Sequence, residues 1–349
     1  MKVVVIGDPL VSSSTLVAAV REMNVGEGPH DIQRFEWYSD LTKDQFQEHI
    51  LDIERNGPEA VAIPEGILEA LGDADYLFCH YAPISKAMLQ AGQGLKLIGT
   101  CRGGVENVHL PTVKEKGLPF LHVIRNAEPV ADFTVGLMYA ETRNIARAHS
   151  SIQQGRWEKQ FANDAYKTTL SNLTVGIVGV GYIGQQVIER LNGLKVKVLA
   201  YDPFADAKKL EAAGLTLTMV DQLEELFETA DVISLHMRVT PQTKNMIDRT
   251  YISRMKPSSY LINTARADLL HKEDLVAALQ ARQIAGAALD VNWVEPIPQG
   301  DPLLQLDNVT LTTHIAGDTV DAIPNSPFLL KRVVNDYIEK GYSDMLIQP

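Results

Sequence analysis

The sequence predicts an α/β protein built on two doubly wound parallel sheets, and three observations lead to this prediction. Apolar runs of strand length alternate with helical stretches along most of the 349 residues, a pattern typical of βαβ units that excludes all-α and all-β folds. The length suits two domains with separate cores. Hydrophobic residues make up 45% of the chain and charged residues 22%, as in globular proteins.

The first series of apolar runs predicts strands at 3–6, 76–79, 97–100 and 120–122. Residues 25–75 are rich in Gly, Pro, Asp and Glu and carry no regular pattern, so no element is assigned there. From Pro129 to Gln154 the pattern predicts one long helix, because a proline stands in its first turn and Gly155 follows its end.

A second series predicts six strands, at 174–178, 196–201, 231–236, 260–263, 285–289 and 309–312. Six strands with intervening helices make a complete dinucleotide-binding sheet. The stretch 318–340 is helical but interrupted by Pro324 and Pro327, and no strand is expected after it. This tail should pack on the N-terminal part, so the domains are predicted as 1–128 with 318–349, and 129–317.

The charge and the cysteines restrict the class of partner. With 32 basic and 44 acidic residues the net charge is -12, which repels nucleic acids and anionic membrane surfaces, and no 18-residue apolar run is present. Cys79 and Cys101 show neither a disulfide framework nor a metal-binding spacing. We therefore expect a soluble cytoplasmic protein that binds small molecules and no metal.

A glycine fingerprint fills 179–184, directly after an apolar strand and at the start of a helix. There Gly179 permits a tight turn, Gly181 lets the backbone approach a pyrophosphate, and Gly184 allows close helix packing. Asp202 ends the next strand, where a carboxylate can bond the adenosine ribose hydroxyls. A purely structural turn is the alternative, but the combination favours binding of NAD.

Three polar residues follow three later predicted strands, namely Arg266, Glu295 and His314. Ligands of open α/β sheets bind at that edge of the sheet. Oxidation of an alcohol needs a base for the hydroxyl proton, and a histidine oriented by a carboxylate supplies one. Arginine supplies a forked cation for a substrate carboxylate. Taken singly, each residue can be interpreted without catalysis, as a surface histidine, a solvated arginine or a turn glutamate. Together, the three residues indicate hydride chemistry.

A second glycine loop follows a strand of the first domain, at Arg102, Gly103 and Gly104. Consecutive glycines can form a backbone nest for a substrate carboxylate. Arg102 could hold a second anionic group, such as a phosphate or a distal carboxylate, or could be a solvated charge. His80 and Tyr81 end another strand of this domain.

With these motifs the sequence resembles the NAD-dependent D-isomer-specific 2-hydroxyacid dehydrogenases, which include 3-phosphoglycerate dehydrogenase. The resemblance covers most of the chain. It rests on the loop at Arg102, the fingerprint at 179–184, the segment from Leu235-His236 to Thr240-Pro241, the turn 263–266, the segment 290–296 and the segment 313–317.

The resemblance implies a Rossmann cofactor domain inserted into a discontinuous, flavodoxin-like substrate domain, and a homodimer formed mainly through the cofactor domain. It implies that Arg266 binds the substrate carboxylate and carbonyl, that His314 is the acid/base paired with Glu295, and that Asp290 holds the nicotinamide amide. The further cofactor-binding residues that it implies are Tyr182, Ile183, His236, Thr240, Thr264, Ala265 and Gly317.

The sequence departs from the family pattern near these residues. Ala267 follows Arg266 where the family has Gly, His271 stands where an Asp is usual, Thr313 replaces the Pro before His314, and Asp132 replaces a Glu. None of these changes removes a catalytic group. Two alternatives stay open: an NAD-sensing regulator or corepressor, and a formate- or phosphite-type dehydrogenase. Formate enzymes pair the histidine with Gln, so Glu295 favours the hydroxy-acid branch.

Overall fold

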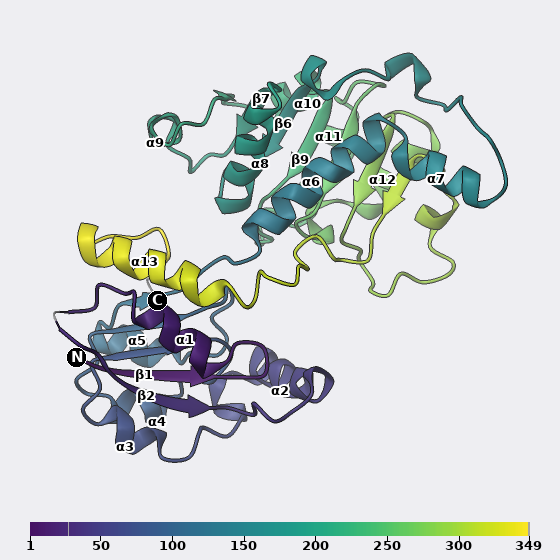
Figure 1. Ribbon diagram of the computed structural model, residues 1–349. Coiled ribbons are helices and arrows are strands. Elements are labelled where there is room, and N and C mark those ends of the chain that lie inside the picture. Colours follow the sequence, from purple (N-terminus) through teal and green to yellow (C-terminus); the bar gives the residue numbers. More distant parts are fainter. Residues whose placement is uncertain (27, 348–349) are drawn as a thin grey trace. The chain divides into compact units, whose positions relative to one another are not determined.

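The structure is a computed structural model that describes residues 1–26 and 28–347, and it confirms the predicted fold class. The chain divides into two compact units, each built around its own mostly parallel sheet. Unit 1 comprises Met1–Arg125 and Thr319–Pro349, and unit 2 comprises Asn126–Asp318. Both units have helices on the two faces of the sheet, as doubly wound folds do (Figure 1).

Unit 1 contains a six-stranded sheet in the order β13-β5-β4-β3-β1-β2. Without β13 this is the flavodoxin-like order, and only β13 runs antiparallel to its neighbour. The strands are β1 (Lys2–Gly7), β2 (Asp31–Glu36), β3 (Tyr76–Cys79), β4 (Leu97–Thr100), β5 (Phe120–Leu121) and β13 (Leu346–Ile347).

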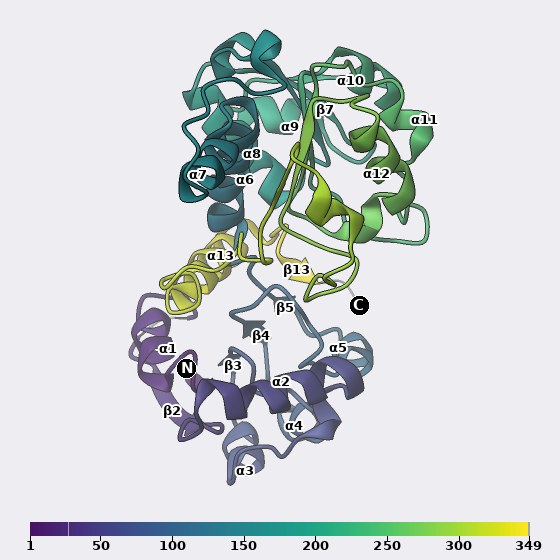
Figure 2. The same ribbon diagram turned by 90° about the vertical axis from the view of Figure 1, so that its right-hand side faces the viewer.

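Alternate side chains of β1 enter two cores, because successive residues of a strand point to opposite faces. Val3 and Val5 pack against α1 and α13, which lie side by side in Figure 1. Val4 and Ile6 pack on the opposite face, under α2 to α5 (Figure 2). The helices are α1 (Ser13–Val20), α2 (Lys43–Asn56), α3 (Ile67–Leu71), α4 (Lys86–Ala91), α5 (Leu110–Lys116) and α13 (Ser326–Lys340), with a 3-10 turn at Pro58–Ala60.

Unit 2 contains a seven-stranded parallel sheet in the order β12-β11-β10-β9-β6-β7-β8. This is the dinucleotide-binding order with one strand added at the β12 edge. The strands are β6 (Thr174–Val178), β7 (Lys197–Tyr201), β8 (Thr218–Met219), β9 (Val232–Leu235), β10 (Tyr260–Asn263), β11 (Gly286–Leu289) and β12 (Val309–Leu311).

Two helical layers cover this sheet. Helices α6, α8 and α9 pack on one face, and α10, α11 and α12 pack on the other. The helices are α6 (Ala127–Thr142), α7 (Ile145–Gln153), α8 (Tyr182–Gly193), α9 (Ala207–Ala212), α10 (Leu223–Thr229), α11 (Arg249–Ile252) and α12 (Lys272–Gln280), with 3-10 turns at Asp164–Tyr166, Leu170–Asn172, Ala267–Leu269 and Pro302–Gln305. Among the described helices of either unit, none is long and apolar enough to cross a membrane.

The prediction of one helix from Pro129 to Gln154 is wrong, because Asn144 separates α6 from α7. Asn144 has a left-handed backbone with φ 56°, which ends the regular helix. Its amide nitrogen donates to Asn163 Oδ1 at 2.7 Å, and Arg147 donates to its oxygen at 3.0 Å. Both bonds stabilise the break, and the bond to Asn163, 19 residues away, leaves no mark in the local sequence pattern.

Three short or polar strands were not predicted. The edge strand β2 lies within 25–75 and has the sequence DIQRFE, which lacks an apolar run because each of its residues is exposed or only half-buried. The two-residue strand β8 adds a seventh strand to unit 2. The expectation that no strand follows the C-terminal helix is wrong, because β13 pairs with β5. That helix also begins only at Ser326, with Pro327 in its first turn.

Candidate active site

Arg266, Glu295 and His314 follow three neighbouring strands of unit 2, which are β10, β11 and β12. All three strands are parallel, so the residues that follow them lie at one edge of the sheet. The topology of the sheet thereby gathers at one edge the residues that the sequence spreads over 49 positions, from 266 to 314.

His314 and Glu295 form a direct pair. His314 Nδ1 lies 2.9 Å from Glu295 Oε2, and the second carboxylate oxygen accepts the N–H of Asn292 at 2.9 Å. The bond from Asn292 and then the bond from His314 lower the pKa of Glu295 below its usual value. The side chains of His314 and Glu295 are 45% and 41% exposed. Among the described residues His314 Nε2 has no hydrogen-bond partner, so it is available to a ligand.

The loop that carries His314 is held by the buried Asp290. Its Oδ1 accepts the Thr312 hydroxyl at 2.6 Å and the Ile315 N–H at 3.0 Å, while Oδ2 accepts the Ala316 N–H at 2.9 Å. His314 itself has a φ of 59°, which is unfavourable for a residue with a side chain. The bonds to Asp290 on both sides of His314 stabilise this conformation.

Arg266 stands in a tight turn directly after β10. The buried side chain of Asn263 accepts the Ala265 N–H at 3.0 Å and donates to the Arg266 carbonyl at 2.9 Å. The guanidinium is exposed and donates to the Ala265 carbonyl at 2.6 Å. Its positive charge also contributes to the lowered pKa of Glu295, after the bonds from Asn292 and His314. The turn thus presents a cation beside the histidine–carboxylate pair.

The glycine fingerprint has the local geometry that a dinucleotide requires. Gly179 has a φ of 94°, and a Cβ there would lie 2.9 Å from the carbonyl carbon of His236. A Cβ on Gly184 would overlap the carbonyl oxygen of Gly179, whereas a Cβ on Gly181 would meet nothing within 4 Å. The open side of Gly181 lies at the first turn of α8, which contains Tyr182 and Ile183 and directs N–H groups outward. These residues fit a bound pyrophosphate.

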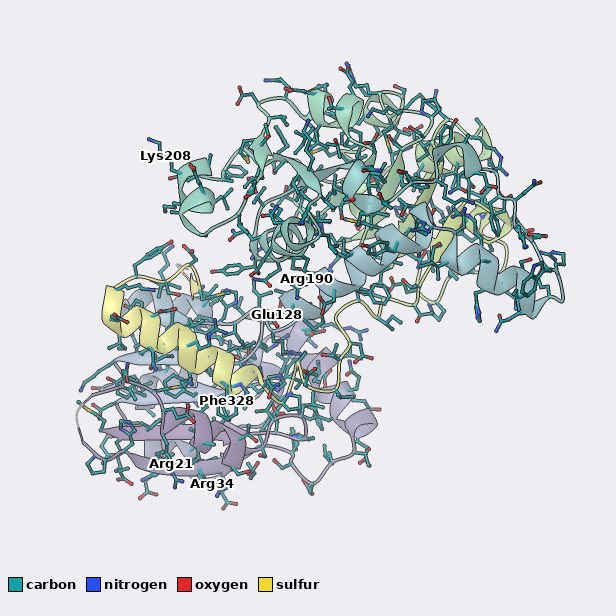
Figure 3. All side chains as sticks on the ribbon, turned by 45° about the horizontal axis from the view of Figure 1, so that its top comes forward. Arg21, Arg34, Glu128, Arg190, Lys208 and Phe328 are labelled. Carbon is teal, nitrogen blue, oxygen red and sulfur yellow. The ribbon has the colours of Figure 1, made fainter. Side chains whose placement is uncertain are left out.

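Asp202 is fixed just beyond β7 by two backbone bonds. Its Oδ2 accepts the Val180 N–H at 2.8 Å, and its Oδ1 accepts the Phe204 N–H at 2.9 Å. The cations that follow, Lys208 and Lys209, lie on α9 and are exposed, and Figure 3 shows Lys208 extending outward. A carboxylate therefore stands next to the fingerprint, and no lysine among the described residues forms an ion pair with it.

Two further predicted cofactor residues follow β9. His236 Nε2 lies 2.9 Å from the Ser234 hydroxyl, and burial lowers the pKa of His236 to about 4, so the ring is neutral at pH 7. Thr240 lies in the exposed turn that comes next, where its hydroxyl accepts the Thr243 N–H at 3.2 Å.

Thr264 and Gly317 connect the site to helix α6. The Thr264 hydroxyl lies 2.8 Å from that of Thr134, which also lies 2.7 Å from the Val130 carbonyl. Because a hydroxyl has one proton, Thr134 donates to Val130 and accepts from Thr264. A Cβ on Gly317 would lie 3.2 Å from the Asn126 side chain at the start of α6.

The glycine loop of unit 1 differs from the prediction of a backbone nest. A nest needs a residue in the left-handed region, and neither Gly103 nor Gly104 has a positive φ. Instead, a Cβ on Gly104 would lie 2.8 Å from the guanidinium of Arg102. Arg102 is buried, with its guanidinium 3.3 Å from Glu54 and 3.2 Å from Glu106. Its charge is thus already compensated within unit 1, which weakens its assignment to a second anionic group.

The structure adds a role for one named residue and shows contributors that sequence reasoning missed. Asp290, which the resemblance assigns to the nicotinamide amide, holds the His314 loop with both of its oxygens. In unit 1, Asp8 and Arg125 contact His80 and were not predicted. The signal available was position, because Asp8 directly follows β1 and Arg125 lies four residues beyond β5.

Comparison with known proteins agrees with this arrangement. The family model described as the NAD-binding domain of D-isomer specific 2-hydroxyacid dehydrogenases matches residues 135–316. A glyoxylate reductase of Thermofilum pendens is 37% identical over 264 residues, which cover 74% of this chain and 76% of that protein. A D-3-phosphoglycerate dehydrogenase of Methanocaldococcus jannaschii is 36% identical over 265 residues, covering 74% of this chain but only 48% of that protein.

Among solved structures, the NAD-complexed D-isomer specific 2-hydroxyacid dehydrogenase of Lactobacillus delbrueckii ssp. bulgaricus has the same fold. It superposes with a TM-score of 0.70 at 23% identity, and the match covers 100% of both chains. The match to the family model and the identities of the two relatives go further than the fold. This chain belongs to the D-isomer specific 2-hydroxyacid dehydrogenase family, and its NAD-binding domain lies in unit 2.

Proposed function

We propose that the protein transfers hydride between NAD and a D-2-hydroxy acid or its 2-oxo acid, with His314, Glu295 and Arg266 as the catalytic residues. The observation that carries this proposal is the His314–Glu295 pair, 2.9 Å apart, at the sheet edge that Arg266 shares. An intact acid/base pair also favours catalysis over a purely regulatory role and, by its Glu, over the formate-type alternative.

In oxidation, the neutral His314 takes the proton of the substrate hydroxyl at Nε2. Its Nδ1–H donates to Glu295, whose negative charge stabilises the imidazolium that results. In reduction the protonated ring returns that proton to the oxygen. Arg266 binds the substrate carboxylate with its forked donors and stabilises the negative charge that develops on the carbonyl oxygen.

When bound, NAD would supply the hydride acceptor for oxidation and, as NADH, the hydride donor for reduction. We propose that the backbone at 179–184 holds the pyrophosphate and that Asp202 accepts the ribose hydroxyls. His236, Thr240, Thr264, Ala265 and Gly317 complete the proposed cofactor set, with Asp290 acting through the loop of His314. The open space over Gly181 and the fixed carboxylate of Asp202 support this assignment.

The substrate is proposed as a class, a small D-2-hydroxy or 2-oxo acid. The two relatives described above act, by their names, on phosphoglycerate and on glyoxylate. The test is NADH oxidation with a panel of 2-oxo acids that includes phosphorylated and sugar-derived members. We expect the protein to turn over at least one of these acids, and we expect this turnover to require His314. A chain that binds NADH but turns over no 2-oxo acid would favour the regulator.

The role of Arg266 is tested by Arg266→Lys, because a lysine keeps the charge but not the two parallel donors. KM for the acid should rise and kcat should fall. Arg249→Lys is the matched control, since Arg249 is an exposed arginine of unit 2 that is paired with Asp274. Unchanged kcat/KM in Arg266→Lys would assign the substrate carboxylate to another group.

We also propose a homodimer formed through unit 2. Three large apolar side chains, Ile145, Ile152 and Trp157, are 56%, 54% and 77% exposed on α7 and the segment after it. Large apolar side chains with this much exposure are typical of interfaces. Light scattering should give twice the mass of one chain, and Ile152→Ser combined with Trp157→Ser should give one chain's mass.

For the compartment we propose the reducing cytoplasm. Cys79 and Cys101 are adjacent in the sheet, with the Cys101 N–H donating to the Cys79 carbonyl at 2.9 Å, and both are free thiols. Burial raises the pKa of Cys79 to about 12, which keeps the thiol protonated and unreactive.

A further inference from the structure

Asp8 is a buried carboxylate at the end of the first strand of unit 1. Its side chain is 0% exposed. Oδ1 accepts the N–H groups of Leu10 at 2.9 Å and Val11 at 3.0 Å, and Oδ2 accepts the N–H of Tyr81 at 2.9 Å. Three backbone donors on one carboxylate favour its charged form and fix its orientation.

His80 bridges this carboxylate to an arginine. Its Nδ1 lies 3.0 Å from Asp8 Oδ2, and its Nε2 lies 2.9 Å from Arg125 Nη1. A guanidinium only donates hydrogen bonds, so His80 Nε2 is the acceptor. The single ring proton is therefore on Nδ1, which donates a hydrogen bond to Asp8. Burial lowers the pKa of His80, and the ring is therefore neutral. Asp8 selects the tautomer, and the tautomer positions Arg125.

Arg125 keeps most of its donors and its charge. Of the five N–H groups of a guanidinium, one is used by His80, and among the described residues no carboxylate forms an ion pair with Arg125. The group also lies 5.9 Å from the centre of the Tyr81 ring and is half-buried. Arg102, 4.1 Å from the same ring, is instead paired with Glu54 and Glu106. Carboxylates thus neutralise the charge of Arg102, whereas no described carboxylate is paired with Arg125.

The cluster formed by Asp8, His80 and Arg125 lies where open α/β sheets bind ligands. In the order β2-β1-β3-β4-β5, the second strand lies on one side of β1, and the third, fourth and fifth strands lie on its other side. The direction in which strands are added therefore reverses between β1 and β3. Ligands bind in the crevice beyond the carboxyl ends of the strands at such a switch point. Asp8 is the first residue after β1, and His80 is the first residue after β3. The two residues that position Arg125 therefore stand on either side of the switch point of unit 1.

We propose that Arg125 is an oxyanion-binding residue of unit 1, positioned by His80 and Asp8, whose ligand is a carboxylate or a phosphate. This site is additional to Arg266 of unit 2. The oxyanion has two possible sources, a second anionic group on the acid substrate or free phosphate. Only the substrate source depends on the proposed function.

The first experiment titrates the full chain with inorganic phosphate by calorimetry in a buffer free of other oxyanions. Arg125→Met should weaken phosphate binding roughly tenfold or more, the value of a charge-assisted bond. Arg34→Met is the control, because Arg34 belongs to the same unit and donates to an uncharged acceptor, the Ser13 hydroxyl. Arg266→Met should leave phosphate binding to unit 1 intact.

The positioning role of His80 has its own readout. The nitrogen NMR spectrum of the His80 ring should show the Nδ1–H tautomer at pH 7 in the wild type. It should change in Arg125→Met but not in Arg34→Met, while circular dichroism shows that both variants are folded. Arg125→Lys should keep part of the affinity, because the charge remains without the fork.

The second experiment separates the two sources. KM is measured for 2-oxoglutarate, which has a second carboxylate, and for 2-oxobutyrate, which does not. A rise of roughly tenfold or more for 2-oxoglutarate alone in Arg125→Met assigns the oxyanion to the substrate. An unchanged KM for both acids, with loss of phosphate binding, assigns it to free phosphate.

Equal phosphate binding and equal KM values in wild type and Arg125→Met would overturn the proposal, as would an equal loss in Arg34→Met. A wild type that neither binds phosphate nor shows a KM for 2-oxoglutarate that depends on Arg125 would overturn it as well. If no 2-oxo acid is turned over, the proposed function fails, and the phosphate titration still decides the role of Arg125.

Discussion

The chain contains two histidine–carboxylate pairs with nearly the same separation in opposite surroundings. His314 and Glu295 of unit 2 are 2.9 Å apart, with side chains 45% and 41% exposed. His80 and Asp8 of unit 1 are 3.0 Å apart, and both side chains are 0% exposed. In each pair the Nδ1 of the ring faces the carboxylate.

The second ring nitrogen explains why equal distances do not mean equal chemistry. His80 Nε2 is occupied by Arg125, so the buried ring has no atom at which to exchange a proton with a ligand. His314 Nε2 has no hydrogen-bond partner among the described residues, and its side chain is exposed. Burial and the bond to Arg125 suit the pair in unit 1 to positioning an arginine, and exposure suits the pair in unit 2 to the proposed acid/base role.

The largest expected effect is loss of turnover on removing the exposed ring. His314→Ala should reduce kcat by roughly 100- to 10,000-fold, the contribution of general acid/base catalysis, while NADH binding is retained. The control is His271→Ala, since His271 lies 3.0 Å from Asp274 in the same unit. Stopped-flow turnover with NADH fluorescence titration checks this, and near-normal turnover by His314→Ala would contradict the assignment.

The next effect is on stability. Here a change in the buried pair should cost more free energy of unfolding than a change in the exposed pair. Asp8→Asn replaces the buried charged acceptor of the bonds from Leu10, Val11, Tyr81 and His80 and should lower the free energy of unfolding by about 1.5–3 kcal/mol. Glu295→Gln breaks an exposed pair and should cost about 1 kcal/mol or less. Urea unfolding of both variants is the measurement. Similar losses in the two variants would show that burial does not distinguish the pairs.

A third carboxylate, Asp202, is half-buried and tests cofactor choice. The phosphate of NADP would face it at a few Å, where like charges repel by roughly 1–4 kcal/mol. We expect kcat/KM to favour NAD over NADP by at least about tenfold. Asp202→Asn should narrow the ratio, and Asp206→Asn, which alters only the cap of α9, should not. A wild-type preference for NADP would mean that Lys208 or Lys209 turns in to bind the phosphate.

The smallest expected effect is a change of pH profile. Glu295→Gln removes the negative charge that stabilises the protonated form of His314. Reduction requires that form, so its rate should begin to fall at a lower pH than in the wild type. Rates of 2-oxo acid reduction between pH 5 and 9 are the measurement. Superimposable profiles would show that Glu295 orients the ring without acting on its charge.

Much of the fold followed from local patterns. Strands such as Tyr76–Cys79 and Tyr260–Asn263 have the predicted bounds, because central parallel strands are buried on both faces and so read as continuous apolar runs. The edge strand β2 and the pairing strand β13 carry no such run. The break at Asn144 depends on Asn163, 19 residues away, which no helical periodicity records.

The sequence by itself determined the fold class, the fingerprint at 179–184 and the three polar residues that follow the last strands of unit 2, because these depend on residue type and on local spacing. Only the tertiary structure decided which charges meet. It paired Arg102 with two glutamates, and it brought Asp8, His80 and Arg125 together although they lie at positions 8, 80 and 125 of the sequence. The physical reason is that parallel pairing brings the carboxyl ends of strands from distant parts of the chain to one edge, and local periodicity does not encode that pairing.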